Sequence, residues 1–410
     1  MDRLIGKVQP YAWGSTTALP EFLGEEPTGE PQAELWLGAH ASAPSMLGDH
    51  GLDEVIEADP EAVVGVASTV EYGARLPYLL KVLAAGQPLS LQAHPSRAQA
   101  EAGFAREEEA GIARDAPERT YRDDWPKPEA FVGLGDVDAL CGFREPAATY
   151  ALFQRLGVPA ALELMEPLRA DPQGGLAEVF ERLLRLSDDE LSVLGDVVAA
   201  ARSVSADDEL GRFARTAVEL ADRFPQDPGV LAALLMNRVH YGRNQAMFLP
   251  AGNLHAYLHG LGVEIQANSD NVLRGGLTSK HIDVDELLHL LDFTPGQPEV
   301  MDGVEQSPGV FAYPTPVPEF ALWRLECDGD PVAVPAEGDG RVVLCVRGDV
   351  TLRCDDEALA LSQGQAAFVL AADVGAQLTG AGTAFVAAPG IDGADQMTHQ
   401  LTTGLATAPG

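Results

Sequence analysis

The stretch from Leu89 to Pro95 carries residues that could bind a metal ion. Strand-like alternation places Ser90, Gln92 and His94 on one face of this stretch. Two potential ligands that are two residues apart on a strand can reach the same ion. A polar strand face would explain the same pattern, so the metal interpretation depends on partners elsewhere in the chain.

A second polar stretch runs from Pro250 to Thr278. A turn after Pro250 delivers His255 onto a strand, and alternation puts Tyr257 on the face that carries His255. Burying many polar groups is costly unless each is paired or bound to an ion, so this density of polar residues indicates a site. The next strand carries three more polar residues on one face: Glu264, Gln266 and Asn268.

The third element is a proline-stiffened segment that contains Lys127 and Glu129. Pro126 and Pro128 restrict the backbone, so the segment is expected to be extended and to present both side chains. The alternative interpretation of this segment alone is a surface turn that carries an ion pair.

Four residues from these stretches form a plausible ligand set, namely Gln92, His94, Glu129 and His255. Two imidazoles, one carboxylate and one amide oxygen, without a thiolate, favour one zinc ion per chain with an open position for water or substrate. Iron(II) and manganese fit the same ligand types. We interpret four other histidines as structural: His240, His259, His281 and His289.

The elements that must position these residues follow a β-helix-β order. Residues 1–145 contain short apolar runs broken by Gly and Pro, which predict strands. Apolar residues recur at spacings of three and four over 146–240 and predict helices. Strand patterns return over 241–318 and continue with Gly-rich turns over 319–410. We expect a mainly β fold that contains an inserted helical domain.

A weak internal repeat suggests what the C-terminal segment does. Residues 245–252 and 365–372 are similar, and only the first copy is followed by a histidine, His255. Residues 320–398 contain no histidine at all. We predict a C-terminal β module without metal or catalysis, although chance similarity in an Ala-rich chain is the alternative explanation.

Length and composition limit the kinds of function. A chain of 410 residues with 46% hydrophobic residues predicts two or three globular domains. The formal net charge of −35 disfavours nucleic acid and anionic membranes as partners, and an anionic substrate would need a local cluster of Lys and Arg. The four cysteines show no paired spacing, and no long apolar run occurs. We expect a cytoplasmic monomer.

Seven motifs resemble the class I phosphomannose isomerases, a zinc-dependent cupin family, and they occur in the family's order. They are Tyr11–Ser15, Ala33–Gly38, Leu76–Leu83, Leu89–Pro95, Lys127–Glu129, Cys141–Arg144 and Pro250–Lys280.

This resemblance implies a fold and an activity. The implied fold is a cupin jelly-roll catalytic barrel (1–145 and 241–318) with an inserted helical domain (146–240) and a second jelly roll (319–410). The implied reaction is the reversible isomerisation of mannose 6-phosphate and fructose 6-phosphate through a metal-stabilised enediol. The phosphorylated sugar is then the substrate, and zinc is held by the four ligands given above.

The resemblance also implies roles for individual residues. Arg274 would stabilise charge on the enediolate, and the substrate phosphate would contact Lys81, Ser90 and Lys280. For proton transfer, Glu264, Lys127, Asp270 and a metal-bound water are all suitable by type, with Glu264 and Lys127 as the preferred acid-base pair. We expect further substrate contacts from Trp13, Tyr257 and Asp270.

The sequence departs from the family pattern at three places. Trp125-Pro126 stands where Asn-His is usual, so a histidine is not available there for proton transfer. Ser279 replaces a common proline, and Ser96-Arg97 replaces an Asn-Lys or Asp-Lys pair. Two other functions compete with isomerisation: a cupin metal oxygenase, and a sugar-binding cupin without catalysis.

Overall fold

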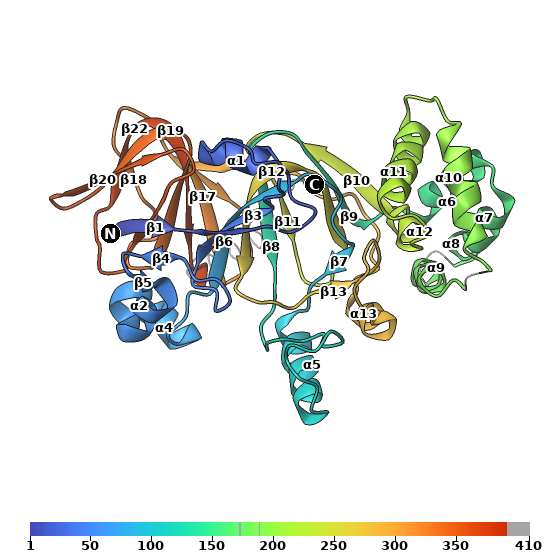
Figure 1. Cartoon of the computed structure of the whole chain (residues 1–410), viewed down its shortest axis with the longest axis horizontal. Coiled ribbons are helices and arrows are strands. Elements are labelled where there is room, and N and C mark those ends of the chain that lie inside the picture. The colour runs from blue at the N-terminus through green and yellow to red at the C-terminus, as the bar shows by residue number, and fades with distance from the viewer. Residues whose placement is uncertain (172–173, 188, 392–410) are drawn as a thin grey trace, which may run out of the picture.

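The computed structural model describes residues 1–171, 174–187 and 189–391. Two antiparallel sheets lie next to each other along the long axis, and a group of helices occupies one end (Figure 1). We call the sheet next to these helices the central sheet and the other one the outer sheet.

The central sheet is organised around one long strand, β12. Its first half pairs with β7 and β9, and its second half pairs with β6 and β8. The change of partner occurs at Gly260, whose φ of 136° suits glycine and lets the strand bend. The central strands are β2 (Lys7–Gln9), β3 (Glu34–Gly38), β6 (Tyr78–Ala85), β7 (Gln92–Ala93), β8 (Glu129–Gly133), β9 (Val137–Phe143), β10 (Met236–Tyr241), β11 (Gln245–Leu249), β12 (His255–Ala267), β13 (Leu273–Arg274) and β14 (Met301–Asp302).

Strand β6 shows how this sheet serves two purposes. All eight of its residues are buried, and its side chains alternate between the two faces. Leu80 and Val82 join an apolar core that also contains Leu344 and Phe385 of the outer sheet, so this core joins the two sheets. Lys81 points to the opposite face, where its cross-strand partner Glu264 also lies.

The outer sheet is built mostly from the C-terminal segment. Its strands are β1 (Asp2–Ile5), β4 (Met46–Leu47), β5 (His50–Gly51), β15 (Val304–Ser307), β16 (Val310–Tyr313), β17 (Ala321–Asp328), β18 (Val332–Ala333), β19 (Arg341–Cys354), β20 (Glu357–Ser362), β21 (Ala366–Val369) and β22 (Gln377–Ala388). The N-terminal strand β1 pairs with β21 and buries Leu4 in the shared core. The strands from 1–145 and 241–318 are therefore divided between both sheets.

Helices occupy the range from Pro146 to Ala233, where the sequence pattern predicts them. They are α6 (Pro146–Leu156), α7 (Pro159–Leu164), α8 (Glu166–Ala170), α9 (Gly175–Leu184), α10 (Ser192–Arg202), α11 (Glu209–Arg223) and α12 (Gly229–Ala233). In α11, Asp208 caps the first turn, and Phe213, Ala217 and Leu220 form one buried stripe. Their core includes Leu140 of β9 and Met236 of β10, so the helices pack directly on the central sheet.

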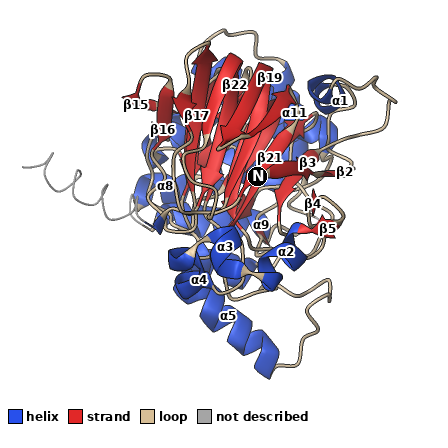
Figure 2. Cartoon of the chain, turned by 90° about the vertical axis from the view of Figure 1, so that its left-hand side faces the viewer, coloured by secondary structure: helices blue, strands red, loops and turns tan. Residues whose placement is uncertain are grey.

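The remaining helices lie outside this group. α2 to α5 gather along one edge of the two sheets (Figure 2). Among the described residues, no helix combines the length and apolarity needed to cross a membrane. The four cysteines are buried and free. The remaining helices are α1 (Ala18–Leu23), α2 (Leu52–Ala58), α3 (Pro60–Val64), α4 (Val66–Tyr72), α5 (Arg97–Glu109) and α13 (Val284–Leu290).

Candidate metal centre and substrate cavity

A cavity of about 880 Å³ opens above the polar face of the central sheet. All predicted site residues except His94 and His255 line it, and these two contact Glu129 in its wall. The chain has only four lysines, and three of them (Lys81, Lys127 and Lys280) line this cavity. Most of the few lysines of this acidic chain therefore line one cavity.

His94, Glu129 and His255 converge in the wall of the cavity. His94 Nε2 lies 3.4 Å from Glu129 Oε1, and His255 Nε2 lies 3.4 Å from Glu129 Oε2. Tetrahedral zinc with ligands at about 2.0–2.1 Å requires ligand atoms roughly 3.3 Å apart, which is close to these distances. Within the described chain, this is the one group of three or more His, Cys, Asp or Glu side chains that could share an ion.

Gln92 is the fourth residue of the predicted ligand set, and it lines the cavity. Its amide nitrogen lies 3.3 Å from His255 Nε2, and a half-turn of the amide would present the oxygen at the same point. Cross-strand pairing explains this position, because Gln92 of β7 stands opposite His255 of β12 on one side and opposite Arg274 of β13 on the other. Directly paired residues point to the same face of a sheet.

Buried atoms without partners provide the test of whether a metal fits. His94 Nε2 and Glu129 Oε2 are fully buried, and neither has a hydrogen bond within the described residues. Such orphan atoms are costly unless something satisfies them. The other ring nitrogens are held by main-chain oxygens: His94 Nδ1 lies 2.7 Å from Asn271 O, and His255 Nδ1 lies 3.1 Å from Asn253 O. This second contact is how metal-binding imidazoles are commonly oriented.

The protonation states also suit a metal ion. Burial lowers the pKa of His94 to about 4, against the opposing pull of Glu129, so the imidazole is neutral at pH 7. Burial alone would raise the pKa of Glu129, but the positive charge of Lys127 and the contacts with His94 and His255 hold it well below its usual value. A neutral imidazole and an ionised carboxylate are the forms that bind metals.

Lys81 and Glu264 form a buried ion pair at the floor of the cavity. Lys81 Nζ donates to Gln266 Oε1 at 2.6 Å and to Glu264 Oε2 at 3.1 Å, and Glu34 Oε1 lies 3.6 Å away. Burial raises the pKa of Glu264, with Lys81 opposing the shift. The ammonium group of Lys81 is already surrounded by acceptors, so its contacts do not favour the predicted role in phosphate binding.

Lys127 and Glu129 are presented as the two prolines predict. Glu129 begins β8, and Lys127 Nζ lies 3.1 Å from Glu129 Oε1. Both side chains are buried, so this is an interior pair and not the surface turn of the alternative interpretation.

A group of cations lies on the outer side of the cavity. Burial lowers the pKa of Arg274, and the charge of Arg122 lowers it further. Burial also lowers the pKa of Lys280, with added effects from Arg274 and Arg122. None of the three has an ion pair with a carboxylate among the described residues. Three mutually repelling cations that face a cavity form a site for an anion.

Sequence reasoning missed Arg122 and the contacts that hold its loop. Asp123 accepts hydrogen bonds from Ser269 Oγ at 2.7 Å and from Asp270 N at 2.8 Å. Asn271 accepts a hydrogen bond from Arg122 N at 2.8 Å through Oδ1. The loop before Lys127 is thereby fixed to the loop before Arg274, and the one available signal was an arginine close to the Lys-Pro-Glu motif.

The unusual Trp125 has a structural explanation. Its ring is buried against Tyr72, with centroids 5.5 Å apart, and the guanidinium groups of Arg75 and Arg97 each lie 5.6 Å from its centroid. The side chain does not line the cavity. Trp125 therefore anchors the loop.

The other predicted substrate contacts occupy different parts of the wall. Trp13 stacks on Tyr11 with centroids 5.8 Å apart. Tyr257 is fully buried, and its hydroxyl has no hydrogen bond among the described residues. Asp270 lies 3.4 Å from His40, and Ser90 is half-buried. Of the histidines interpreted as structural, His259 pairs with Glu219 at 2.9 Å away from the cavity, whereas His281 lines the cavity.

Known proteins match this chain over most of its length. A sequence model of the phosphomannose isomerase type I catalytic domain matches residues 1–146. Mannose-6-phosphate isomerase of Escherichia coli (strain K12) is 38% identical over 381 residues, which cover 90% of this chain and 95% of that protein. The chain belongs to the type I phosphomannose isomerase family. The family predicted from the motifs is therefore confirmed.

Similarity to this family extends to plants and to solved structures. Mannose-6-phosphate isomerase 1 of Arabidopsis thaliana is 30% identical over 398 residues, covering 90% of this chain and 89% of that protein. A zinc-bound mannose 6-phosphate isomerase has a TM-score of 0.87 at 34% identity and covers 94% of this chain and 98% of its own. The apo form from Salmonella typhimurium also has a TM-score of 0.87, at 35% identity, covering 95% and 99%.

Proposed function

We propose that this protein is a zinc-dependent isomerase that interconverts mannose 6-phosphate and fructose 6-phosphate. The observation that carries the proposal is a buried His-Glu-His cluster in the wall of a cavity that is also lined by a group of unpaired cations. Relatives that cover nearly the whole chain are named mannose-6-phosphate isomerases, and a similar structure is described as zinc-bound.

The metal would be held by Gln92, His94, Glu129 and His255. When bound there, zinc would supply a Lewis acid that stabilises negative charge on the sugar oxygens at C1 and C2. Arg274 stands beside Gln92 in the sheet and would place a permanently charged guanidinium next to the same oxygens.

The phosphate would lie at the outer side of the cavity. Arg122 and Lys280 are exposed there and have no carboxylate partner among the described residues. Ser90 lines the same cavity and can donate a hydrogen bond. We therefore assign phosphate binding to Arg122, Lys280 and Ser90, and this replaces the role first predicted for Lys81. Anchoring the phosphate would fix C1 and C2 for proton transfer.

Proton transfer would use the floor of the cavity. Conversion of the aldose to the ketose removes the proton from C2 and returns one to C1, while the hydroxyl proton of O2 is lost and O1 gains a proton. Glu264, with its raised pKa, is suited to carry the carbon proton, and Lys81 would orient its carboxylate. Lys127 would exchange protons with O1 and O2.

The two alternative functions have less support. The relatives that cover nearly the whole chain are named mannose-6-phosphate isomerases, and the raised pKa of Glu264 suits proton transfer better than sugar binding alone. We also propose that both sheets are cupin-type jelly rolls and that the inserted domain predicted over 146–240 ends before β10 (Met236–Tyr241), which pairs with β9 in the central sheet. Cytoplasmic location, a monomeric state and the lack of nucleic acid or membrane partners stay predictions.

The proposal is tested by incubating the purified protein with mannose 6-phosphate and measuring fructose 6-phosphate. Conversion should be lost after metal removal by a chelator and restored by zinc. Oxygen uptake by the protein would instead support the oxygenase. Substrate binding by zinc-loaded protein without turnover would support the sugar-binding alternative.

Lys280→Ala should raise KM for mannose 6-phosphate by roughly tenfold or more and change kcat less. The reason is that one charge-assisted contact to phosphate, worth about 1.5–3 kcal/mol, is lost before and during the reaction alike. Steady-state kinetics provide the measurement. Lys7→Ala removes an exposed lysine outside the cavity and should leave KM unchanged. Equal KM values for the two variants would contradict the phosphate assignment.

A further inference from the structure

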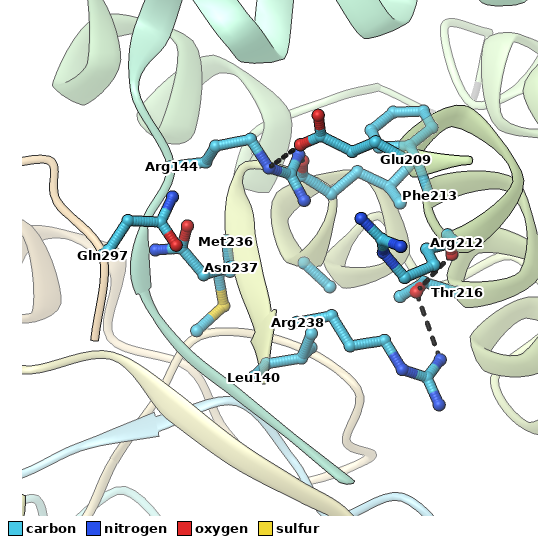
Figure 3. Close-up of a pocket in the computed structure, with 12 residues that line it drawn as sticks. Leu140, Arg144, Glu209, Arg212, Phe213, Thr216, Met236, Asn237, Arg238 and Gln297 are labelled. Atoms are coloured by element: carbon cyan, nitrogen blue, oxygen red, sulfur yellow. Dashed lines mark hydrogen bonds and ion pairs between the residues drawn. The ribbon is translucent and has the colours of Figure 1, made fainter. Parts of the chain in front are cut away.

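A second pocket lies between the helical group and the central sheet (Figure 3). Its walls come from the end of β9, from β10 and from the first turns of α11. Its volume is about 120 Å³, and it shares no lining residue with the large cavity. It is therefore separate from the candidate active site.

Three arginines line this small pocket, against one carboxylate. Arg144, Arg212 and Arg238 come from three different elements, and Glu209 is the one acid among the lining residues. In the view of Figure 3, the head of Arg212 lies between those of Arg144 and Arg238. In a chain with a net charge of −35, a pocket lined by three arginines is a local concentration of cations, although Glu219 and Asp138 pair with Arg238 from outside the lining.

Arg144 is buried and makes one side-chain hydrogen bond within the described residues. It is 8% exposed, donates from Nη1 to Leu234 O at 3.1 Å, and approaches Glu209 only to 3.8 Å from Nε. Its Nη2 has no hydrogen bond among the described residues. Burial lowers the pKa of Arg144, and the charge of Arg212 lowers it further against the pull of Glu209. The buried Arg144 and the exposed Arg212 thus repel each other, and Glu209 offsets this repulsion only from 3.8 Å.

Arg212 itself makes no ion pair or side-chain hydrogen bond within the described residues. Arg238 differs, because it pairs with Glu219 at 2.7 Å and with Asp138 at 3.6 Å, and its Nη1 donates a hydrogen bond to Thr216 Oγ1 at 3.2 Å. The pocket therefore offers two incompletely paired guanidinium groups beside a third that is fixed in place. Guanidinium groups bind oxyanions through pairs of N–H donors.

We propose that this pocket is a second anion site that binds inorganic phosphate or the phosphate group of a phosphomonoester. Its volume of about 120 Å³ is enough for a small oxyanion. Donors that arrive from three elements suit the several oxygens of a tetrahedral dianion better than the two oxygens of a planar carboxylate.

Anion binding here would join the helical group to the central sheet. Arg212 belongs to α11, while Arg144 follows β9 and Arg238 lies in β10, so a shared ion would connect them. Strand pairing continues from Asn237 in the pocket wall through Cys141 to the metal-binding residue His255. The ion would thus stabilise the side of the sheet that presents a metal ligand, whatever reaction the metal supports.

Equilibrium dialysis of the zinc-loaded full-length protein against radiolabelled inorganic phosphate tests the site. The wild type should bind two equivalents, one in each cavity. Arg212→Glu should weaken one of them by at least about tenfold, because a charge-assisted contact becomes a repulsion. Arg215→Glu is the matched control, since Arg215 is exposed on the same helix and lies outside the pocket. It should retain both equivalents.

Lys280→Ala should weaken the other equivalent, which separates this proposal from the proposed isomerase function. The unfolding midpoint should also rise more in phosphate than in acetate of equal ionic strength, and Arg212→Glu should lose most of this difference. Arg212→Gln serves as a milder variant if charge reversal impairs folding. Identical phosphate stoichiometry and affinity in the wild type and both Arg212 variants would overturn the proposal.

Discussion

Glu129→Gln is expected to lower kcat/KM for mannose 6-phosphate by about 10³-fold or more and to weaken zinc binding. The substitution preserves shape but replaces the carboxylate that lies 3.4 Å from both histidines with a neutral amide. Stabilisation of developing charge by a metal is worth several kcal/mol, and each 1.36 kcal/mol is a tenfold change in rate. Kinetics and elemental analysis of the dialysed protein measure both effects.

Glu319→Gln is a suitable control for this experiment. Glu319 is also a buried carboxylate with a basic partner, Arg97 at 2.9 Å, but it does not line the cavity. Its substitution should leave the zinc content and kcat unchanged. A Glu129→Gln protein that keeps full activity with one tightly bound zinc would show that this carboxylate is not a ligand.

Arg274→Ala should lower kcat by on the order of 10² or more while zinc stays bound and KM changes less. Arg274 is half-buried, faces the cavity and stands opposite Gln92 in the sheet, where charge on the sugar oxygens would develop. Removing one donor to such a charge typically costs about 10²–10³ in kcat. Steady-state kinetics and metal analysis of the same preparation make the comparison.

Arg274→Lys should recover only part of the activity, because a lysine keeps the charge and loses the planar fork. Arg243→Ala, an exposed arginine outside the cavity, should behave as the wild type. If Arg274→Ala kept a normal kcat and raised KM alone, Arg274 would be a binding residue and its charge-stabilising role would be wrong.

Local patterns in the sequence predicted which polar side chains share a strand face, while the family resemblance supplied Arg274, Lys81 and Lys280. Alternation predicted the shared face of Glu264 and Gln266, and both side chains contact Lys81 there. The prolines around Lys127 predicted its presentation beside Glu129. These features depend on the backbone of a few neighbouring residues, which the sequence specifies directly.

Side-chain contacts between residues far apart in the chain could not be predicted from local sequence patterns. The phosphate-binding role predicted for Lys81 did not take Glu34 into account. This carboxylate approaches Lys81 from the neighbouring strand β3. The link from Asp123 to Ser269 joins residues 146 positions apart. No motif in the sequence predicted that Arg122 lines the cavity. The contacts of the neighbouring Asp123 with Ser269 place it there.

Contacts between distant residues also explain why the observed strands differ from the predicted ones. Strand β1 joins the outer sheet because Leu4 completes the apolar core between the sheets, a contact that no local pattern encodes. The strand expected around Ser90 and His94 is only Gln92–Ala93. Pro88 and Pro95, on either side of that segment, cannot donate to a ladder, which limits strand length there.

Titration of metal-free protein with zinc shows directly whether one zinc site carries out the isomerisation. Conversion of mannose 6-phosphate to fructose 6-phosphate should start near zero, rise in proportion to added zinc and reach a plateau at one equivalent per chain. The rise should be absent in Glu129→Gln and present in Glu319→Gln. Full activity before zinc is added, or no activity in protein that holds one zinc at this site, would contradict the account.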